Sequence, residues 1–211
     1  MKIVCPSYEI LHPSSFAYEC QLIERAARTC YKSEDAIAEE SYKVLIKHLI
    51  DRGHEAMLEF GNMVVHFVTD RGVSHELVRH RLCSFAQEST RYCNYSKEKF
   101  GSECTFIYPG DLNSDSWTKK RHEWGWACIE AEYRYLKMLE EGVSPQTARA
   151  VLPNSLKTEI VVKANFREWR HIFKLRAISK AAHPDMRRLM IPLYEECRET
   201  CPTIFEMGDA E

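Results

Sequence analysis

The stretch LKTEIVVKANFREWRHIFKLR, residues 156–176, decides the fold of this chain. Its first part, 156–164, is rich in β-branched residues and predicts a strand. Residues 165–168 then have the form of a capping box, with Asn165 in the place of Ser or Thr. A helix is therefore expected to begin there and to run to about residue 183, before Pro184.

Outward from this stretch, helical patterns outnumber strands. A second strand is expected at GNMVVHFVTD (61–70), and the polar segment 83–103 is interpreted as a loop. Helices are expected after Ser15, from Ser33 to Gly53, over 73–82, over 116–141, from Pro145 behind the cap Ser144 to Pro153, and over 185–200 with a kink near Pro192. No repeat or linker interrupts the pattern, so we predict one α+β domain over residues 1–211.

Composition limits the classes of function. The net charge of −2 gives no overall field that would draw the molecule to nucleic acid or to a membrane. No apolar run reaches the length of a bilayer, and the start of the chain does not resemble a signal peptide, so a cytoplasmic location is expected. The nine cysteines form no C-x-x-C pair, and we interpret most of them as small core residues.

Basic residues concentrate in two places, around 79–91 and in 163–188, where eight Lys or Arg face only two acidic residues. A charge run is usually a solvated helix face. At about 100° per residue, however, Arg176 lies with Trp169 and Phe173 on the apolar side, and His183 follows two turns later. A charge there needs an anion, so Arg176 is either half of an ion pair with a carboxylate or a clamp for a ligand.

The segment RHRLCSFAQESTRY (79–92) follows the short helix, where irregular backbone often carries binding groups. Guanidinium groups match phosphate oxygens bidentately, and the hydroxyl of Ser89 can complete such a site. The chain contains neither a G-x-G-x-x-G nor a Walker A sequence. The segment therefore predicts a phosphate site built from arginines.

The same segment resembles a known family. Arg79, His80 and Arg81, followed by Ser84, Ser89, Arg91 and Tyr92, match the signature R-H-R-x-x-S-x-x-x-x-S-x-R-Y of flavin-dependent thymidylate synthases. Similar sequences occur elsewhere along the family's chains: AARTCYKS (26–33), His54 with Glu59, Arg149 before Leu152-Pro153, NFR (165–167), Arg176 and AHPDMR (182–187).

The resemblance implies a fold and a reaction. It implies an α+β domain with a central antiparallel sheet flanked by several helices, in a homotetramer whose active sites lie between subunits. It implies transfer of a methylene group from 5,10-methylenetetrahydrofolate to C5 of dUMP, giving dTMP. FAD would carry the hydride, NADPH would reduce the flavin, and no enzyme nucleophile, metal, nucleic acid or membrane is implied.

The resemblance also implies roles for individual residues. The residues expected to contact FAD are Arg79, His80, Arg81, Gln87, Asn165, Arg167 and His171. Those expected to bind dUMP are Glu76, Leu77, Val78, Arg79, Gln87, Glu88, Ser89, Thr90, Arg91, Arg149 and Arg176. Arg176 is the expected catalytic residue, because a fixed positive charge beside the uracil ring stabilises developing negative charge.

Some positions depart from the family's common pattern, and two other functions compete with it. Cys30 and Ala56 stand where Thr or Ser is frequent, His171 where Asn is, and Glu76 where Gln is. One competing interpretation is a nucleic-acid-binding module that uses 163–188 as a basic helix. The other is a thiol or metal enzyme built on the cysteines and nine histidines.

Overall fold

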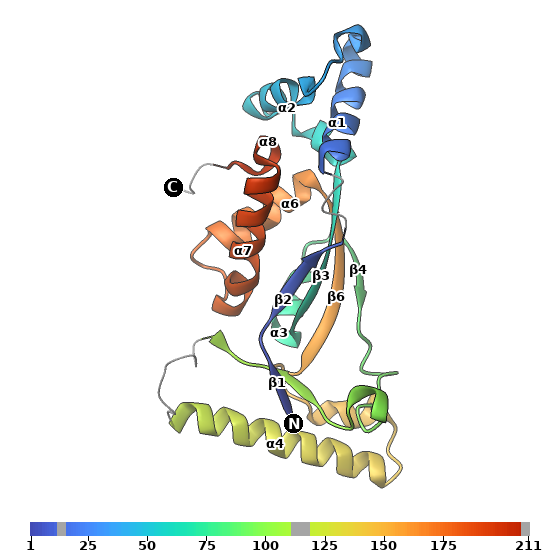
Figure 1. Cartoon of the computed structure of the whole chain (residues 1–211). Helices are drawn as coiled ribbons and strands as arrows, with labels where there is room; N and C mark the ends of the chain where they lie inside the picture. The colour runs from blue at the N-terminus through green and yellow to red at the C-terminus, as the bar shows by residue number, and fades with distance from the viewer. Residues whose placement is uncertain (12–15, 111–118, 208–211) are drawn as a thin grey trace. The chain divides into compact units, whose positions relative to one another are not determined.

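The structure is a computed structural model that describes residues 1–11, 16–110 and 119–207. Within these ranges a four-stranded antiparallel sheet has the order β2-β3-β6-β4 (Figure 1). Its strands are β2 (Ser7–Ile10), β3 (Asn62–Asp70), β6 (Lys157–Asn165) and β4 (Ser84–Gln87). A separate parallel pair joins β1 (Lys2–Val4) to β5 (Thr105–Ile107). Together with the helices, this sheet confirms the predicted α+β class.

The two long strands, β3 and β6, were both predicted to within one residue. Alternate side chains are buried along each of them, as a pleated strand with one covered face requires. In β3 the buried positions are Met63, Val65, Phe67 and Thr69, and in β6 they are Thr158, Ile160, Val162 and Ala164. This alternation fixes the face that each strand turns toward the core.

The chain divides into two compact units. Unit 1 consists of Met1–Ser7, Phe67–Arg79 and Ala86–Val161, and unit 2 consists of Tyr8–His66, His80–Phe85 and Val162–Glu211. The strands β3 and β6 each begin in one unit and end in the other. The prediction of one domain over 1–211 stays a prediction.

Unit 1 contains the helical elements α3 (Arg71–Leu77), η4 (Glu98–Phe100), α4 (Lys119–Glu140), α5 (Pro145–Ala148) and η6 (Arg149–Val151). Its core packs Phe106 of β5 against Cys128 and Tyr135 of α4, with Tyr95 and Ala148. The described part of α4 confirms the helix predicted at 116–141, although residues 116–118 lie outside the described ranges. Ser144 and Pro145 take the N-cap and N1 positions of α5, as predicted.

Unit 2 contains α1 (Phe16–Tyr31), η2 (Glu34–Ala36), α2 (Ser41–Asp51), η3 (Glu55–Phe60), α6 (Phe166–Phe173), η7 (Lys174–Ile178), α7 (Pro184–Thr200) and α8 (Pro202–Phe205). Its core is aromatic: the ring of Phe166 lies 5.9 Å from that of Phe16 and 5.4 Å from that of Phe205. Phe173 contacts Phe205 and Trp169. These rings join α1, α6 and α8, so the start of α6 is held by packing on several sides.

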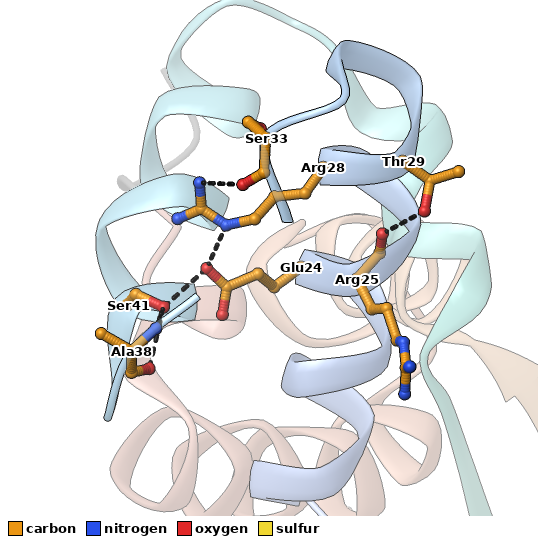
Figure 2. A network of polar contacts seen from close by, with 7 residues as sticks. All are labelled: Glu24, Arg25, Arg28, Thr29, Ser33, Ala38 and Ser41. Carbon is orange, nitrogen blue, oxygen red and sulfur yellow. Dashed lines mark hydrogen bonds and ion pairs between the residues drawn. The ribbon is translucent and has the colours of Figure 1, made fainter. Parts of the chain in front are cut away.

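The second helix begins later than predicted, and a polar network explains why (Figure 2). Ser33 precedes only the short turn η2, whereas α2 begins at Ser41. The buried carboxylate of Glu24 accepts hydrogen bonds from Ser41 Oγ at 2.7 Å and from Arg28 Nε at 2.8 Å. The Ser41 hydroxyl also accepts from the backbone N of Ala38, so the side chain that starts α2 is tied to α1. Gly53, with φ of +71°, ends the segment as predicted.

Three further boundaries correct the sequence predictions. The segment 83–103 is not a plain loop, because it supplies β4 and η4, and SFAQ is too short and polar for its pattern to be recognised. The short helix α3 spans Arg71–Leu77 rather than 73–82, with Asp70 Oδ1 accepting from Val73 N at its start. The strands β1, β2 and β5 and the short helix α8 were not predicted.

The helix that follows Asn165 is also shorter than predicted. After α6 it continues as the π-helical segment η7 and ends at Ile178 instead of about residue 183. His183 is therefore not part of its apolar side; it is the exposed N-cap of α7, and its Nδ1 accepts from Asp185 N. α7 itself spans the predicted last helix and contains Pro192.

Two findings concern membrane-spanning helices and the cysteines. No helix among the described residues combines the length and the apolar character needed to cross a membrane. All nine cysteines lie in described ranges and are free thiols, and five of them are buried: Cys20, Cys104, Cys128, Cys197 and Cys201. Most cysteines are thus core residues, as predicted.

Candidate active site

Asn165 closes strand β6 and caps the helix that carries Arg167, Glu168 and His171. Its Oδ1 accepts a hydrogen bond from the backbone N of Glu168 at 2.8 Å, which satisfies a donor at the start of α6. The capping role predicted for Asn165 is confirmed. The turn that follows leaves Arg167 and His171 exposed and places Glu168 inside, with 7% of its surface exposed.

His80 lies buried between two charged side chains of unit 2. Its Nε2 accepts a hydrogen bond from Nε of Arg176 at 3.2 Å. Its Nδ1 lies 3.4 Å from Oε1 of Glu168, and its ring meets that of His171 edge to face, with the centroids 6.0 Å apart. We call Glu168, His80 and Arg176 the His80 cluster.

Burial and charge set the protonation of the His80 cluster. Burial first, then the positive charges of Arg176 and His171, lower the pKa of His80 to about 4, so its ring is neutral at neutral pH. Burial also raises the pKa of Glu168, which His171 partly opposes. The close contact between Glu168 and His80 is therefore a carboxylate facing a neutral ring rather than an ion pair.

Arg176 lies at the centre of the π-helical segment η7 and is half-buried. Widening the helix changes the direction of every side chain after Phe173, so the regular spacing used in the sequence prediction does not apply to Arg176. Its guanidinium still points inward enough to reach buried His80. Single π-turns within helices occur frequently at functional sites.

A pocket of about 1190 Å³ lies in unit 2 beside the start of α6. Three of the residues predicted to contact FAD line it: Asn165, Arg167 and His171. Its further lining residues are Ile50, Glu55, Glu59, Leu82, Glu168, Arg170, Lys174, Ile178, Glu206 and Met207. Of these, Glu59 was recognised only as part of the turn with His54, and Glu168 only as a capping-box residue.

The chemistry of this pocket fits a flavin nucleotide. Its volume exceeds the roughly 300–1,000 Å³ of sites for drug-sized ligands, as a dinucleotide requires. Arg167 and Lys174 are exposed cations suited to a pyrophosphate, while the amide of Asn165 and the imidazole of His171 offer hydrogen-bonding groups. Arg167 Nη1 donates to Glu59 Oε1 at 2.7 Å, so its guanidinium is oriented at the edge of the pocket.

The predicted dUMP segments lie in unit 1, where the structure shows how several of them are held. Gln87 Nε2 donates to Ser74 Oγ at 2.9 Å and to Thr158 Oγ1 at 3.2 Å, and both hydroxyls are buried. Arg149, itself exposed, donates from Nη1 to Oγ1 of buried Thr90 at 2.9 Å. These contacts hold Gln87 and Arg149 in defined orientations.

Residues 89–93 form a tight turn, which we call the Ser89 turn. The carbonyl of Ser89 accepts from the backbone N of Tyr92 and of Cys93, and its Oγ accepts from Arg91 N at 3.3 Å. Among the residues that the structure describes, no carboxylate or imidazole contacts this hydroxyl. That Ser89 forms a substrate hydrogen bond rather than acting as a nucleophile stays a prediction.

Two of the predicted dUMP residues have their side chains engaged inside unit 1. Leu77 has 1% of its surface exposed. The carboxylate of Glu88 accepts from Tyr95 OH at 2.9 Å and lies 3.1 Å from Lys157 Nζ. A role for Leu77 or Glu88 in binding would therefore fall to the backbone, whereas Val78, Arg79 and Arg91 have exposed side chains and Glu76 is half-buried.

Four of the eight basic residues of 163–188 contact carboxylates or carbonyls of the same chain. Arg167 pairs with Glu59, and Arg170 donates to the carbonyl of Ile204 and lies near Glu55. Arg187 donates to the carbonyl of Ser179, and Arg188 pairs with Asp185. These internal contacts give no support to a nucleic-acid-binding helix.

Comparison with known proteins decides the family. The family model described as thymidylate synthase complementing protein matches residues 16–203. The chain belongs to this family. It is 33% identical over 208 residues to the flavin-dependent thymidylate synthase of Corynebacterium glutamicum, covering 90% of this chain and 79% of that one. It is 30% identical to the protein of that name from Geobacter sulfurreducens (85% and 78% covered) and 34% identical to that from Pyrococcus horikoshii (70% and 59% covered).

Membership of the thymidylate synthase complementing protein family makes the unusual positions informative. Cys30 is exposed at the end of α1, where its Sγ donates to the carbonyl of Ala26. Ala56 is exposed in η3. His171 lines the pocket and contacts His80.

The predicted site residues fall into two sets. His80, Arg81, Asn165, Arg167, His171 and Arg176 belong to unit 2. Arg79, Gln87, Arg149 and the two dUMP segments, 76–79 and 87–91, belong to unit 1. That the two sets form one active site stays a prediction, and so does the homotetramer.

Proposed function

We propose that this chain is a flavin-dependent thymidylate synthase that converts dUMP to dTMP. The carbon comes from 5,10-methylenetetrahydrofolate, and NADPH is the reductant. FAD, when bound, supplies the hydride that turns the transferred methylene into a methyl group. The observation that carries the proposal is the family match over residues 16–203, which contains every residue assigned to the site.

The polar residues of unit 2 support the binding of FAD. Asn165, Arg167 and His171 line one pocket, and exposed Arg81 belongs to the same unit. In this proposal Arg167 and Arg81 bind the pyrophosphate through charge-assisted hydrogen bonds. Asn165 and His171 form hydrogen bonds with polar atoms of the cofactor.

The role proposed for Arg176 is to polarise the uracil ring. A guanidinium carries a positive charge at neutral pH and stabilises negative charge that develops on the ring as C5 attacks the methylene carbon. Ionisation at N3 is favoured for the same reason. The Ser89 turn and Arg149 are proposed to hold the phosphate and sugar of dUMP, because hydroxyl and guanidinium groups suit those oxygens.

The decisive test is chemical. Purified protein that contains FAD should release tritium from dUMP labelled at C5 when it is given 5,10-methylenetetrahydrofolate and NADPH, and dTMP should accumulate in equal amount. A control reaction without the folate should form no dTMP. Flavin-loaded protein that binds dUMP yet forms no dTMP under these conditions would refute the proposed function.

The assembly and the location are part of the same proposal. We expect a cytoplasmic homotetramer with active sites between subunits, because the resemblance to flavin-dependent thymidylate synthases implies that assembly. Light scattering coupled to size exclusion measures the assembly directly. A monomer with full activity would show that one chain supplies the whole site.

A further inference from the structure

We propose that Glu168 and His80 are positioning residues that fix the guanidinium of Arg176 in one orientation. The inference rests on the proposed function, since it assigns a partner to the arginine proposed to polarise uracil. It goes beyond that function because Glu168 has so far only a role in capping a helix, and His80 only a role in contacting FAD.

The first step of the argument is the tautomer of His80. A neutral imidazole carries one N–H donor and one acceptor. Arg176 has only donors, so the Nε2 that receives its Nε–H must be the acceptor, 3.2 Å away. The proton of His80 therefore lies on Nδ1, the atom that faces Oε1 of Glu168 at 3.4 Å.

The second step is the role of Glu168. A separation of 3.4 Å is longer than a typical N–H···O hydrogen bond, but the carboxylate still favours a proton on the nearer nitrogen. The opposite tautomer would put an N–H of His80 against the N–H of Arg176. Glu168 thus selects the form of His80 that can accept from Arg176.

The third step is the rigidity of the arrangement. Glu168 belongs to the first turn of α6, where its backbone N is bound by Asn165 and its neighbour Trp169 is fully buried. Glu168 and His80 are themselves buried, with 7% and 6% of their surfaces exposed. Because Nε of Arg176 donates to the fixed ring of His80, the planar guanidinium cannot rotate freely about the torsion next to Nε. The first turn of α6, which holds Glu168, therefore determines the plane of the guanidinium.

Orientation matters for the reaction assigned to Arg176. Transition states are stabilised by groups that already point at the developing charge, because no reorganisation is then needed. Arg176 follows Glu168 by about two turns on a continuous helical segment, so one packed element carries both ends of the contact. His80 joins them from the R-H-R segment.

The test uses two substitutions of Glu168 in the FAD-loaded protein. Glu168→Leu removes the acceptor that faces Nδ1, and Glu168→Gln restores an acceptor oxygen without charge. We expect kcat to fall about 10- to 100-fold in the Leu variant, the range for loss of a hydrogen bond to a charged group, and less in the Gln variant. KM for dUMP should stay near that of the parent, and turnover is expressed per bound FAD, because Glu168 also lines the pocket. Glu199→Leu, an exposed position on α7, is the matched control.

A double-mutant cycle tests whether Glu168 acts through His80. In His80→Gln the amide oxygen can accept from Arg176 near the position of Nε2, and an amide has no tautomer to select. Glu168→Leu should then lower kcat much less in the His80→Gln background than in the parent. Equal losses in both backgrounds would overturn the proposal.

A measurement without turnover completes the test. The ¹⁵N chemical shifts of the His80 ring, assigned by comparison with His80→Gln, should show at pH 7 a protonated Nδ1 and an unprotonated Nε2. A proton on Nε2 would overturn the proposal. If Arg176→Ala is inactive while Glu168→Leu has the parent's kcat, the positioning role fails and the proposed function stands; if Arg176→Ala is fully active, the proposed role of Arg176 itself fails.

Discussion

The His80 cluster and the Ser89 turn hold their polar groups in opposite ways. In the cluster, Glu168 and His80 are almost fully buried and His80 is kept neutral. In the turn, backbone hydrogen bonds set the shape, and Arg91 is exposed, as is Arg149, which is bound to Thr90 in the same unit. A buried, neutral partner suits an arginine whose direction matters, whereas exposed arginines suit the capture of a phosphate from water. The predictions below test this contrast.

The largest expected effect is that of Arg176→Ala. Loss of a fixed group that stabilises developing charge lowers kcat about 10²- to 10³-fold, while FAD binding and melting temperature should change little. Arg176→Lys should also be poor, because an ammonium cannot reproduce the planar fork. Turnover and thermal melting are the two measurements, with exposed Arg198→Ala on α7 as the control.

The result also separates the two interpretations of Arg176 from the sequence. If Arg176 served mainly in a structural ion pair, its removal would strand a buried carboxylate and lower the free energy of unfolding by roughly 3–5 kcal/mol. A variant that melts much earlier but keeps near-normal activity per folded molecule would exclude the catalytic role.

The burial of His80 should make stability depend on pH. Its pKa falls from 6.5 to about 4 on folding, so between these values the unfolded chain binds more protons and stability declines as the pH is lowered. The full shift corresponds to about 3 kcal/mol. Glu168 acts in the opposite direction, because its raised pKa favours the folded state as it becomes protonated. Arg176 and His171 are the other charged or titratable groups facing His80.

Urea unfolding at several pH values, with His80→Gln as the comparison, measures this contribution. The free energy of unfolding of the parent should drop more steeply between pH 6.5 and 4 than that of the variant. Parallel curves would mean that the pKa of His80 in the folded protein is close to its ordinary value and that water reaches its ring.

Some of this molecule could be predicted from sequence because local patterns specify it. The strands β3 and β6 and the capping role of Asn165 depend on neighbouring residues, and all were predicted. The start of α2 was wrong because it depends on Glu24, which is distant in sequence from Ser41. The short strands β1, β2, β4 and β5 have three or four residues each and no pattern long enough to recognise.

In the candidate site too, local patterns could be predicted from the sequence and contacts between distant residues could not. The R-H-R segment and Arg176 were singled out by local pattern and given roles by resemblance, but the contact between His80 and Arg176 joins residues 96 positions apart. Glu168 carried a misleading signal, since glutamate at the third position of a helix already has a local explanation. The π-turn at η7 has no sequence signature that distinguishes it from a continued α-helix.

Arg167→Ala should weaken flavin binding without disturbing the fold. Loss of a charge-assisted contact to a phosphate costs about 1.5–3 kcal/mol, or about 10- to 100-fold in Kd. Its partner Glu59 is about half exposed, so the broken pair should change stability by less than about 1 kcal/mol. Flavin fluorescence titration measures the affinity, and exposed Lys163→Ala in β6 is the control. Equal Kd values for parent and Arg167→Ala would remove Arg167 from the flavin site.

The smallest effect is expected for Ser89→Ala, in the Ser89 turn. The turn should persist, because the Ser89 carbonyl still accepts from Tyr92 N and Cys93 N, and only the 3.3 Å contact from Arg91 N is lost. One hydrogen bond to dUMP contributes about 0.5–1.5 kcal/mol, so KM should rise about 3- to 10-fold while kcat stays near that of the parent. Ser96→Ala, whose hydroxyl contacts only Asn94 among the described residues, should match the parent. Abolished turnover with normal dUMP binding would instead make Ser89 a reacting group. The chemical step would then depend on the Ser89 turn as well as on Arg176 in the His80 cluster.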